Sequence, residues 1–119
     1  MRTLKENFFG NLGIGKVAKI EEWLKKYKIT NYTINSDLTI NAKSVKFFGY
    51  SESNFPDFIK FNEVETFEIT HSKITSLRGC PNECVEFNCD CCENLTSLEG
   101  APKECEYFYC GFCKSLTSL

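Results

Sequence analysis

The sequence lacks a long apolar run, an excess of basic residues and a second histidine, and each absence argues against a class of protein. No window approaches the roughly 18 apolar residues that a membrane-spanning helix needs. Fourteen Lys and Arg against sixteen Asp and Glu give a formal net charge of −2, whereas a nucleic-acid-binding protein usually has a basic face. The lone histidine, His71, has no evident partner to orient it as a base. We therefore expect that the protein is not an enzyme and binds no cofactor.

The N-terminus also lacks the features of a secretory signal. Residues 1–15 carry charges within any apolar region and offer no small-residue cleavage site. We therefore expect a cytoplasmic protein of one domain, in which thiols stay reduced. The eight cysteines of the chain are then not expected to form a disulfide framework.

The first part of the chain predicts a helix followed by a hairpin. Apolar residues recur at spacings of three and four at Val17, Ile20, Trp23, Leu24 and Tyr27. This pattern predicts an amphipathic helix over 16–27. Residues 1–15 carry three glycines, and "GNLGIGKV" (10–17) is interpreted as a flexible segment that leads into this helix. Alternating apolar residues on either side of 35–37 predict a short β hairpin, and a further strand is expected from Val45.

Two stretches, residues 74–94 and 95–115, are copies of one 21-residue unit. They read "ITSLRGCPNECVEFNCDCCEN" and "LTSLEGAPKECEYFYCGFCKS", and "LTSL" returns at Leu116. The recurring positions are Ile74/Leu95/Leu116, Leu77/Leu98/Leu119, Gly79/Gly100, Pro81/Pro102 and Glu83/Glu104. A unit this short cannot bury its own apolar side, so the repeat predicts a solenoid with one parallel strand per coil. Residues 47–59 and 64–73 resemble earlier, degenerate units.

The segments "LTSLEGAPKE" and "ITSLRGCPNE" closely resemble the leucine-rich-repeat-like proteins encoded by tailed phages and large viruses. The stretch "KIEEWLKKYKITNYTINSDLTINAKSV" resembles the N-terminal helix-and-hairpin unit of that family. Compared with "FEITHSKITSL", the last two coils carry one more residue between strand and L-x-x-L. The expected fold is α+β, with a helix and hairpin cap (1–44) followed by a leucine-rich-repeat-like parallel solenoid (45–119) in one continuous domain.

The cysteines follow the repeat, which favours a structural role. Six of the eight fall into three equivalent pairs, Cys84/Cys105, Cys89/Cys110 and Cys92/Cys113, whereas Cys80 and Cys91 have no cysteine partner. Buried reduced cysteine behaves as a small apolar residue, so we expect a ladder of mostly unreactive thiols. Zinc ligation, disulfides between stacked cysteines and a catalytic thiol stay open as alternatives, although the spacing lacks two paired zinc knuckles. We expect no metal site.

The outward face of the last two strands is the predicted binding surface. If Phe87, Cys89, Phe108 and Cys110 point inward, the residues between them point outward. We expect a protein partner to contact Glu86, Asn88, Tyr107, Tyr109 and, at the edge, Phe112. The alternative is that these are ordinary solvated strand residues.

The resemblance implies a phage protein in the cytoplasm of an infected host cell. We expect it to bind a host protein, with inhibition of a host defence system such as CRISPR as one outcome, and to contact neither nucleic acid nor membrane. The alternative function is a structural or assembly role in a virion or oligomer. The end of the last coil predicts self-association as a two-fold dimer through Leu116 and Leu119, with Tyr109 and Phe112 nearby.

Overall fold

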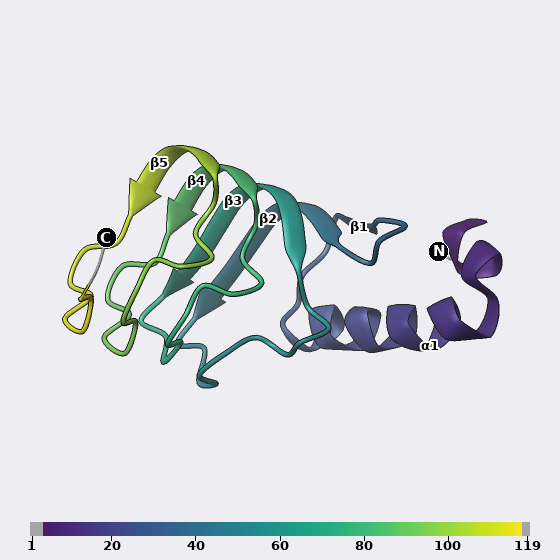
Figure 1. Ribbon diagram of the computed structural model, residues 1–119, viewed down its shortest axis with the longest axis horizontal. Helices are drawn as coiled ribbons and strands as arrows, with labels where there is room; N and C mark the ends of the chain where they lie inside the picture. Colours follow the sequence, from purple (N-terminus) through teal and green to yellow (C-terminus); the bar gives the residue numbers. More distant parts are fainter. Residues whose placement is uncertain (1–3, 118–119) are drawn as a thin grey trace.

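The computed structural model describes residues 4–117, with side chains from residue 15 onward. One helix is followed by a five-stranded sheet that winds as a β solenoid (Figure 1). The elements are α1 (Leu4–Lys26), β1 (Tyr32–Ile34), β2 (Ile40–Phe48), β3 (Phe61–Thr70), β4 (Glu83–Asn88) and β5 (Glu104–Tyr109). Among the described residues, no helix has both the length and the hydrophobicity that crossing a membrane requires.

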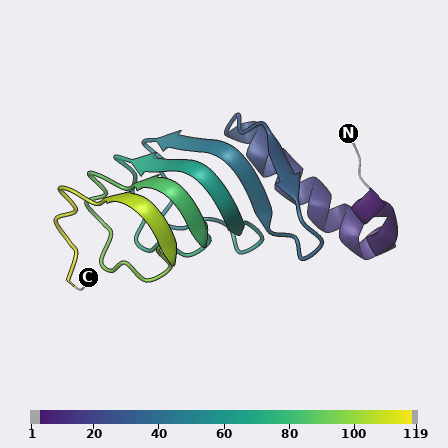
Figure 2. The ribbon, with the colours of Figure 1, turned by 90° about the horizontal axis from the view of Figure 1, so that it is seen from above.

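The strands lie in the order β1-β2-β3-β4-β5, and all neighbours from β2 onward are parallel. Figure 2 shows these parallel strands side by side in chain order. Cys84 pairs with Cys105 and Phe87 with Phe108, so the repeat-equivalent residues are neighbours across the sheet. The predicted parallel solenoid of stacked coils is therefore confirmed.

Helix α1 begins at Leu4, so the prediction of a flexible segment over 10–17 is wrong. The glycines at 10, 13 and 15 lie inside the helix. Glycine lowers helix stability by about 1 kcal/mol relative to alanine, but unlike proline it keeps its backbone N–H for the hydrogen-bond ladder. The helix ends where predicted, because Lys28 adopts a left-handed conformation (φ 59°) and the Ile29 amide donates back to the Leu24 carbonyl at 2.9 Å.

The hairpin forms as predicted, with β1 antiparallel to β2 and Ile34 opposite Ile40. In its turn, the Asp37 carboxylate accepts hydrogen bonds from the Thr39 amide and hydroxyl at 3.1 and 2.6 Å. The expectation of a separate strand from Val45 is wrong, because β2 continues from Ile40 to Phe48. Its polar middle stays extended since β2 pairs with β1 on one side and β3 on the other.

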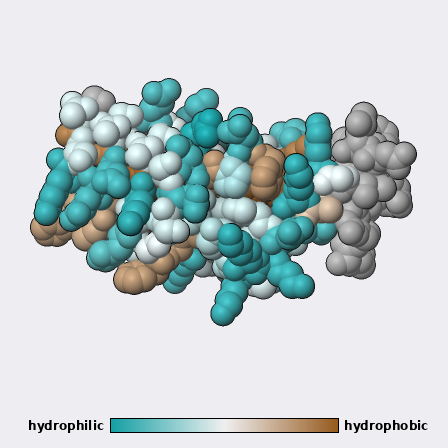
Figure 3. Space-filling model, turned by 90° about the horizontal axis from the view of Figure 1, so that it is seen from below, coloured by the Kyte–Doolittle hydropathy of each residue, from teal (hydrophilic) through white to brown (hydrophobic). Residues whose placement is uncertain are grey.

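The interior contains rows of stacked side chains. The rings of Phe67 and Phe87 stack at 5.3 Å, and those of Phe87 and Phe108 at 5.2 Å. Toward α1 the core becomes an aromatic cluster, in which Trp23 packs against Phe47 at 5.7 Å and Phe55 at 5.6 Å. The side on which the loops lie in Figure 1 is mostly hydrophilic, with isolated hydrophobic residues (Figure 3).

Each coil turns at a glycine that sits against the coil before it. Gly79 (φ +90°) and Gly100 (φ +93°) have the left-handed backbone that side chains disfavour. A Cβ on Gly79 would lie 2.8 Å from the Ile59 carbonyl oxygen, and one on Gly100 would lie 2.6 Å from that of Leu77. The glycines therefore set how closely neighbouring coils approach.

A second column of left-handed residues follows the strands. It consists of Gly49, His71, Cys91 and Phe112, with φ between 55° and 70°. From this column to the next apolar corner residue there are three positions after His71 but four after Cys91 and after Phe112. The extra residue of the last two coils thus lies after the strand, and the strand register is undisturbed.

Candidate protein-binding face

The structure brings four of the five predicted partner-binding residues together on the outward face of β4 and β5. Glu86 lies opposite Tyr107 and Asn88 opposite Tyr109. The two tyrosines are 57% and 43% exposed, whereas Glu86 and Asn88 are half-buried. The inward partners Phe87 and Cys89 are fully buried, while Phe108 and Cys110 are half-buried.

Two interactions support the outward face of β4 and β5, one in the core beneath it and one at the end of β4. Stacking of Phe87 on Phe108 fixes the two strands relative to each other, so the side chains between them keep their spacing. The Asn88 side-chain oxygen accepts the Asp90 amide at 2.9 Å, which orients that side chain at the end of β4. Toward β3 the rows continue with Thr66 and Glu68.

Phe112, the fifth predicted residue, belongs to a different surface. It follows β5 in the left-handed conformation (φ 58°), and its side chain is 80% exposed. It lines a hollow of about 620 Å³ that also includes His71 and Cys91. It was predicted at the edge of the binding face, and it lies beyond β5, which ends at Tyr109.

Of the two predicted self-association residues, the structure describes one. Leu116 is half-buried and packs against the core. Leu119 lies outside the described residues.

All eight cysteines are free thiols, but only four of them are buried. The buried thiols are Cys80, Cys84, Cys89 and Cys92, and the half-buried ones are Cys91, Cys105, Cys110 and Cys113. The expectation of a mostly buried ladder is therefore met only by the inner coil. In the described part of the chain, no group of three or more His, Cys, Asp or Glu side chains could hold a metal ion.

Burial raises the pKa of three inner thiols. Desolvation, and then the neighbouring Cys105, raise the pKa of Cys84 to about 11. Burial also raises the pKa values of Cys80 and Cys89. The Cys84 thiol donates to the main-chain carbonyl of Glu86 at 2.9 Å. It therefore acts as a weak donor within the solenoid.

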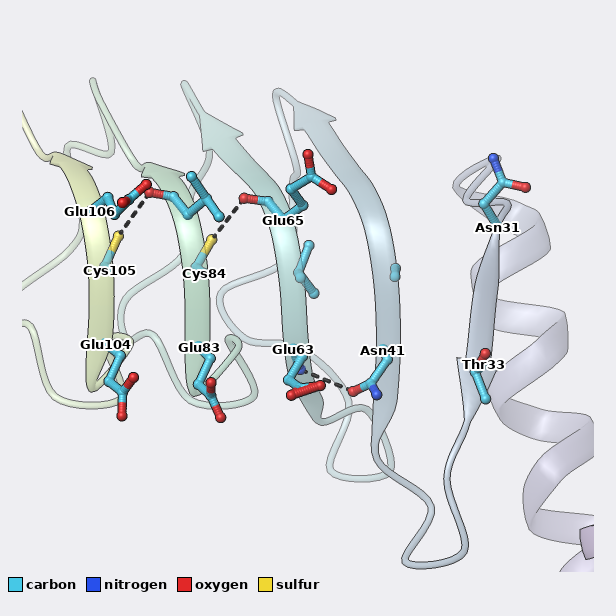
Figure 4. Close-up of a pocket in the computed structure, with 13 residues that line it drawn as sticks. Asn31, Thr33, Asn41, Glu63, Glu65, Glu83, Cys84, Glu104, Cys105 and Glu106 are labelled. Carbon is cyan, nitrogen blue, oxygen red and sulfur yellow. Dashed lines mark hydrogen bonds between the residues drawn. The ribbon is translucent and has the colours of Figure 1, made fainter.

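One surface was missed by reasoning from the sequence. A groove of about 620 Å³ crosses the first halves of β3, β4 and β5 (Figure 4). Five exposed glutamates line it: Glu63, Glu65, Glu83, Glu104 and Glu106. The equivalence of Glu83 and Glu104 was visible in the repeat, but "PNE" and "PKE" were interpreted as solvated corners. The structure places both glutamates at the first position of a strand.

Comparison of the chain with protein-family models, curated proteins and solved structures finds no match. The resemblance to the repeat proteins of phages and large viruses therefore stays a prediction.

Proposed function

We propose that the protein is a non-enzymatic module that binds a protein partner on the outward face of β4 and β5. The observation that carries this proposal is the exposure of Tyr107 and Tyr109 at neighbouring outward positions of one strand, beside Glu86 and Asn88. Tyrosine combines a large apolar contact area with a hydroxyl that can donate a hydrogen bond, and it is enriched among residues that dominate binding energy.

The rigidity of the face supports the same function. Both tyrosines stand on a strand whose inward residue, Phe108, stacks on Phe87. A preformed surface loses less conformational entropy on binding than a flexible loop does. The contact residues therefore need little rearrangement when a partner arrives.

The sequence resemblance supports a phage-encoded, leucine-rich-repeat-like protein whose partner belongs to the host. We extend the proposal to inhibition of a host defence system such as CRISPR, in the cytoplasm of an infected cell. This part of the proposal depends on the resemblance alone, whereas the binding face depends on the described side chains.

Affinity capture from host lysate tests the function. The Tyr107→Ala/Tyr109→Ala variant is expected to lose roughly thirtyfold in affinity for the captured protein, because truncating a central aromatic typically costs about 2 kcal/mol or more. Phe58→Ala is the matched control, since Phe58 is an exposed aromatic on the loop between β2 and β3. A folded tyrosine variant that captures its partner at full strength would refute the site.

A second candidate function, assembly with another copy, is favoured by the last coil. Leu98, Phe108 and Leu116 are only half-buried there, and within residues 4–117 β5 has a neighbouring strand on one side only. Such an edge can accept a further strand. We expect a dimer whose mass in solution, measured at micromolar concentration, falls to that of the monomer in Leu116→Asp. A wild-type mass that stays monomeric at all concentrations excludes this dimer.

A further inference from the structure

The glutamates of the groove are stacked in register. Glu63 is the Cα partner of Glu83, and Glu83 that of Glu104, so three carboxylates occupy the same position on three neighbouring strands. Parallel strands lie about 4.8 Å apart. Figure 4 shows this row along the ends of β3, β4 and β5, with Glu65 and Glu106 farther along the strands.

The floor between the two sets of glutamates is neutral. It includes Cys84 and Cys105, whose thiols donate to the carbonyls of Glu86 and Tyr107 at 2.9 and 3.0 Å. Toward β1 the wall is formed by the uncharged Asn31, Thr33 and Asn41. No residue that lines the groove carries a positive charge.

The row is uncompensated in the protein itself. Among the described residues, none of the five groove glutamates forms a salt bridge. Elsewhere the solenoid pairs its glutamates across coils, as in Glu68 with Lys46 at 3.4 Å and Glu93 with Lys114 at 3.5 Å. Like charges directly opposite each other destabilise a sheet. The groove therefore carries a repulsion that other parts of the same ladder avoid.

The last groove glutamate of β5 is followed in the chain by the first of the two tyrosines. Glu106 directly precedes Tyr107, both side chains are exposed, and Glu86 lies opposite Tyr107 on β4. The faces of exposed tyrosine rings attract guanidinium and ammonium groups. The acidic groove and the aromatic pair thus occupy successive parts of β5, and each of the two parts attracts cations.

We propose that this groove binds a segment of the protein partner that carries two or more arginine or lysine side chains, with Tyr107 and Tyr109 contacting the same segment. The proposal rests on the proposed function, that the sheet face binds a protein, and it adds the chemistry of the partner. Binding places cations between the stacked carboxylates and removes their mutual repulsion, so part of the affinity comes from relief of a strain present in the free protein.

A fluorescein-labelled peptide in which arginine alternates with serine is the probe, and the same peptide with glutamine in place of arginine is its control. Fluorescence anisotropy is expected to show binding of the arginine peptide that weakens as salt is raised. The Glu83→Gln/Glu104→Gln variant is expected to lose about tenfold in affinity. The matched control Glu52→Gln/Glu99→Gln changes the net charge equally, at exposed residues that do not line the groove, and should stay within about twofold of wild type.

Equal losses in the groove variant and the control would show attraction to net charge only and would overturn the proposal, as would equal binding of the glutamine peptide. The midpoint of thermal unfolding of Glu83→Gln/Glu104→Gln should rise, because a like-charge contact is removed. A variant that binds less and melts higher than wild type has not lost binding through unfolding.

Capture from host lysate separates this inference from the proposed function. If Tyr107→Ala/Tyr109→Ala loses the partner and Glu83→Gln/Glu104→Gln retains it in full, the binding function stands and the cationic segment is refuted. If neither variant changes capture, the proposed function itself fails. Loss of the partner in both variants supports both.

Discussion

Coils 74–94 and 95–117 share one repeat and one strand register, yet they differ in burial. Phe87 is fully buried and Phe108 half-buried, and the same holds for Leu95 and Leu116. The inner coil has a neighbour on each side, whereas the last coil has one only. How much a residue contributes to the stability of this fold therefore depends on which coil it lies in, and not on its position within the repeat.

The largest expected effect is a difference between two identical substitutions. Phe87→Ala should lower the free energy of unfolding by about 3–5 kcal/mol, since it opens a cavity between two other phenylalanine rings. Phe108→Ala should cost about half of that or less, because its ring contacts a stacked neighbour on one side only. Urea unfolding of both variants measures the difference, and equal losses would contradict the comparison.

For the corner glycines, in contrast to the phenylalanines, the two coils should respond equally to the same substitution. Gly79 and Gly100 each lie against the preceding coil, and both the inner and the last coil have such a preceding coil. Gly79→Ala and Gly100→Ala should therefore destabilise the protein similarly, by about 1–3 kcal/mol each, through left-handed strain and a backbone clash. Gly15→Ala is the control, because its Cβ meets no atom within 4 Å and lies in a helix. Denaturant midpoints that differ widely between the first two variants would show that the turns are not equivalent.

The pH dependence of stability should distinguish Cys84 from Cys105. The pKa of Cys84 is raised from 9.0 to about 11 by burial and then by Cys105. The unfolded chain therefore loses this proton first, and stability should fall as pH rises from about 9 to about 11. In Cys84→Ala this alkaline decline should be shallower than in wild type, and Cys105→Ala, which removes only the second of the two causes, should lie between them. Thermal melts across this pH range measure it, and identical slopes in all three proteins would disprove the contribution.

The smallest expected effect is a difference in the rate at which the cysteine thiols are alkylated. Iodoacetamide should modify the half-buried thiols of Cys91, Cys105, Cys110 and Cys113 in the folded protein. The buried thiols of the inner coil should react only after unfolding, since burial keeps the reagent away from them. Peptide mass mapping at successive times resolves the two sets, and simultaneous modification of all eight cysteines would contradict the order.

The repeat made the parallel register and the inward phenylalanines predictable, because a fixed period places equivalent residues on neighbouring strands. It could not predict that β2 joins the hairpin to the solenoid, since that depends on pairing with β1 and β3 at once. The left-handed conformation of Phe112 could not be predicted, because phenylalanine is not a residue type that favours it. The groove was missed because glutamates 21 residues apart resemble solvated corners until the strands are stacked.

The corner threonines are bonded one coil to the next. The amide of Thr117 donates to the Thr96 carbonyl at 3.1 Å, and that of Thr96 to the Thr75 carbonyl at 3.4 Å. Their hydroxyls donate to the same carbonyls. Each coil thus finds its hydrogen-bond partners in the coil before it. A further 21-residue unit inserted into the array would meet the same donors and acceptors, so the solenoid can lengthen by one whole coil without new contacts having to be designed.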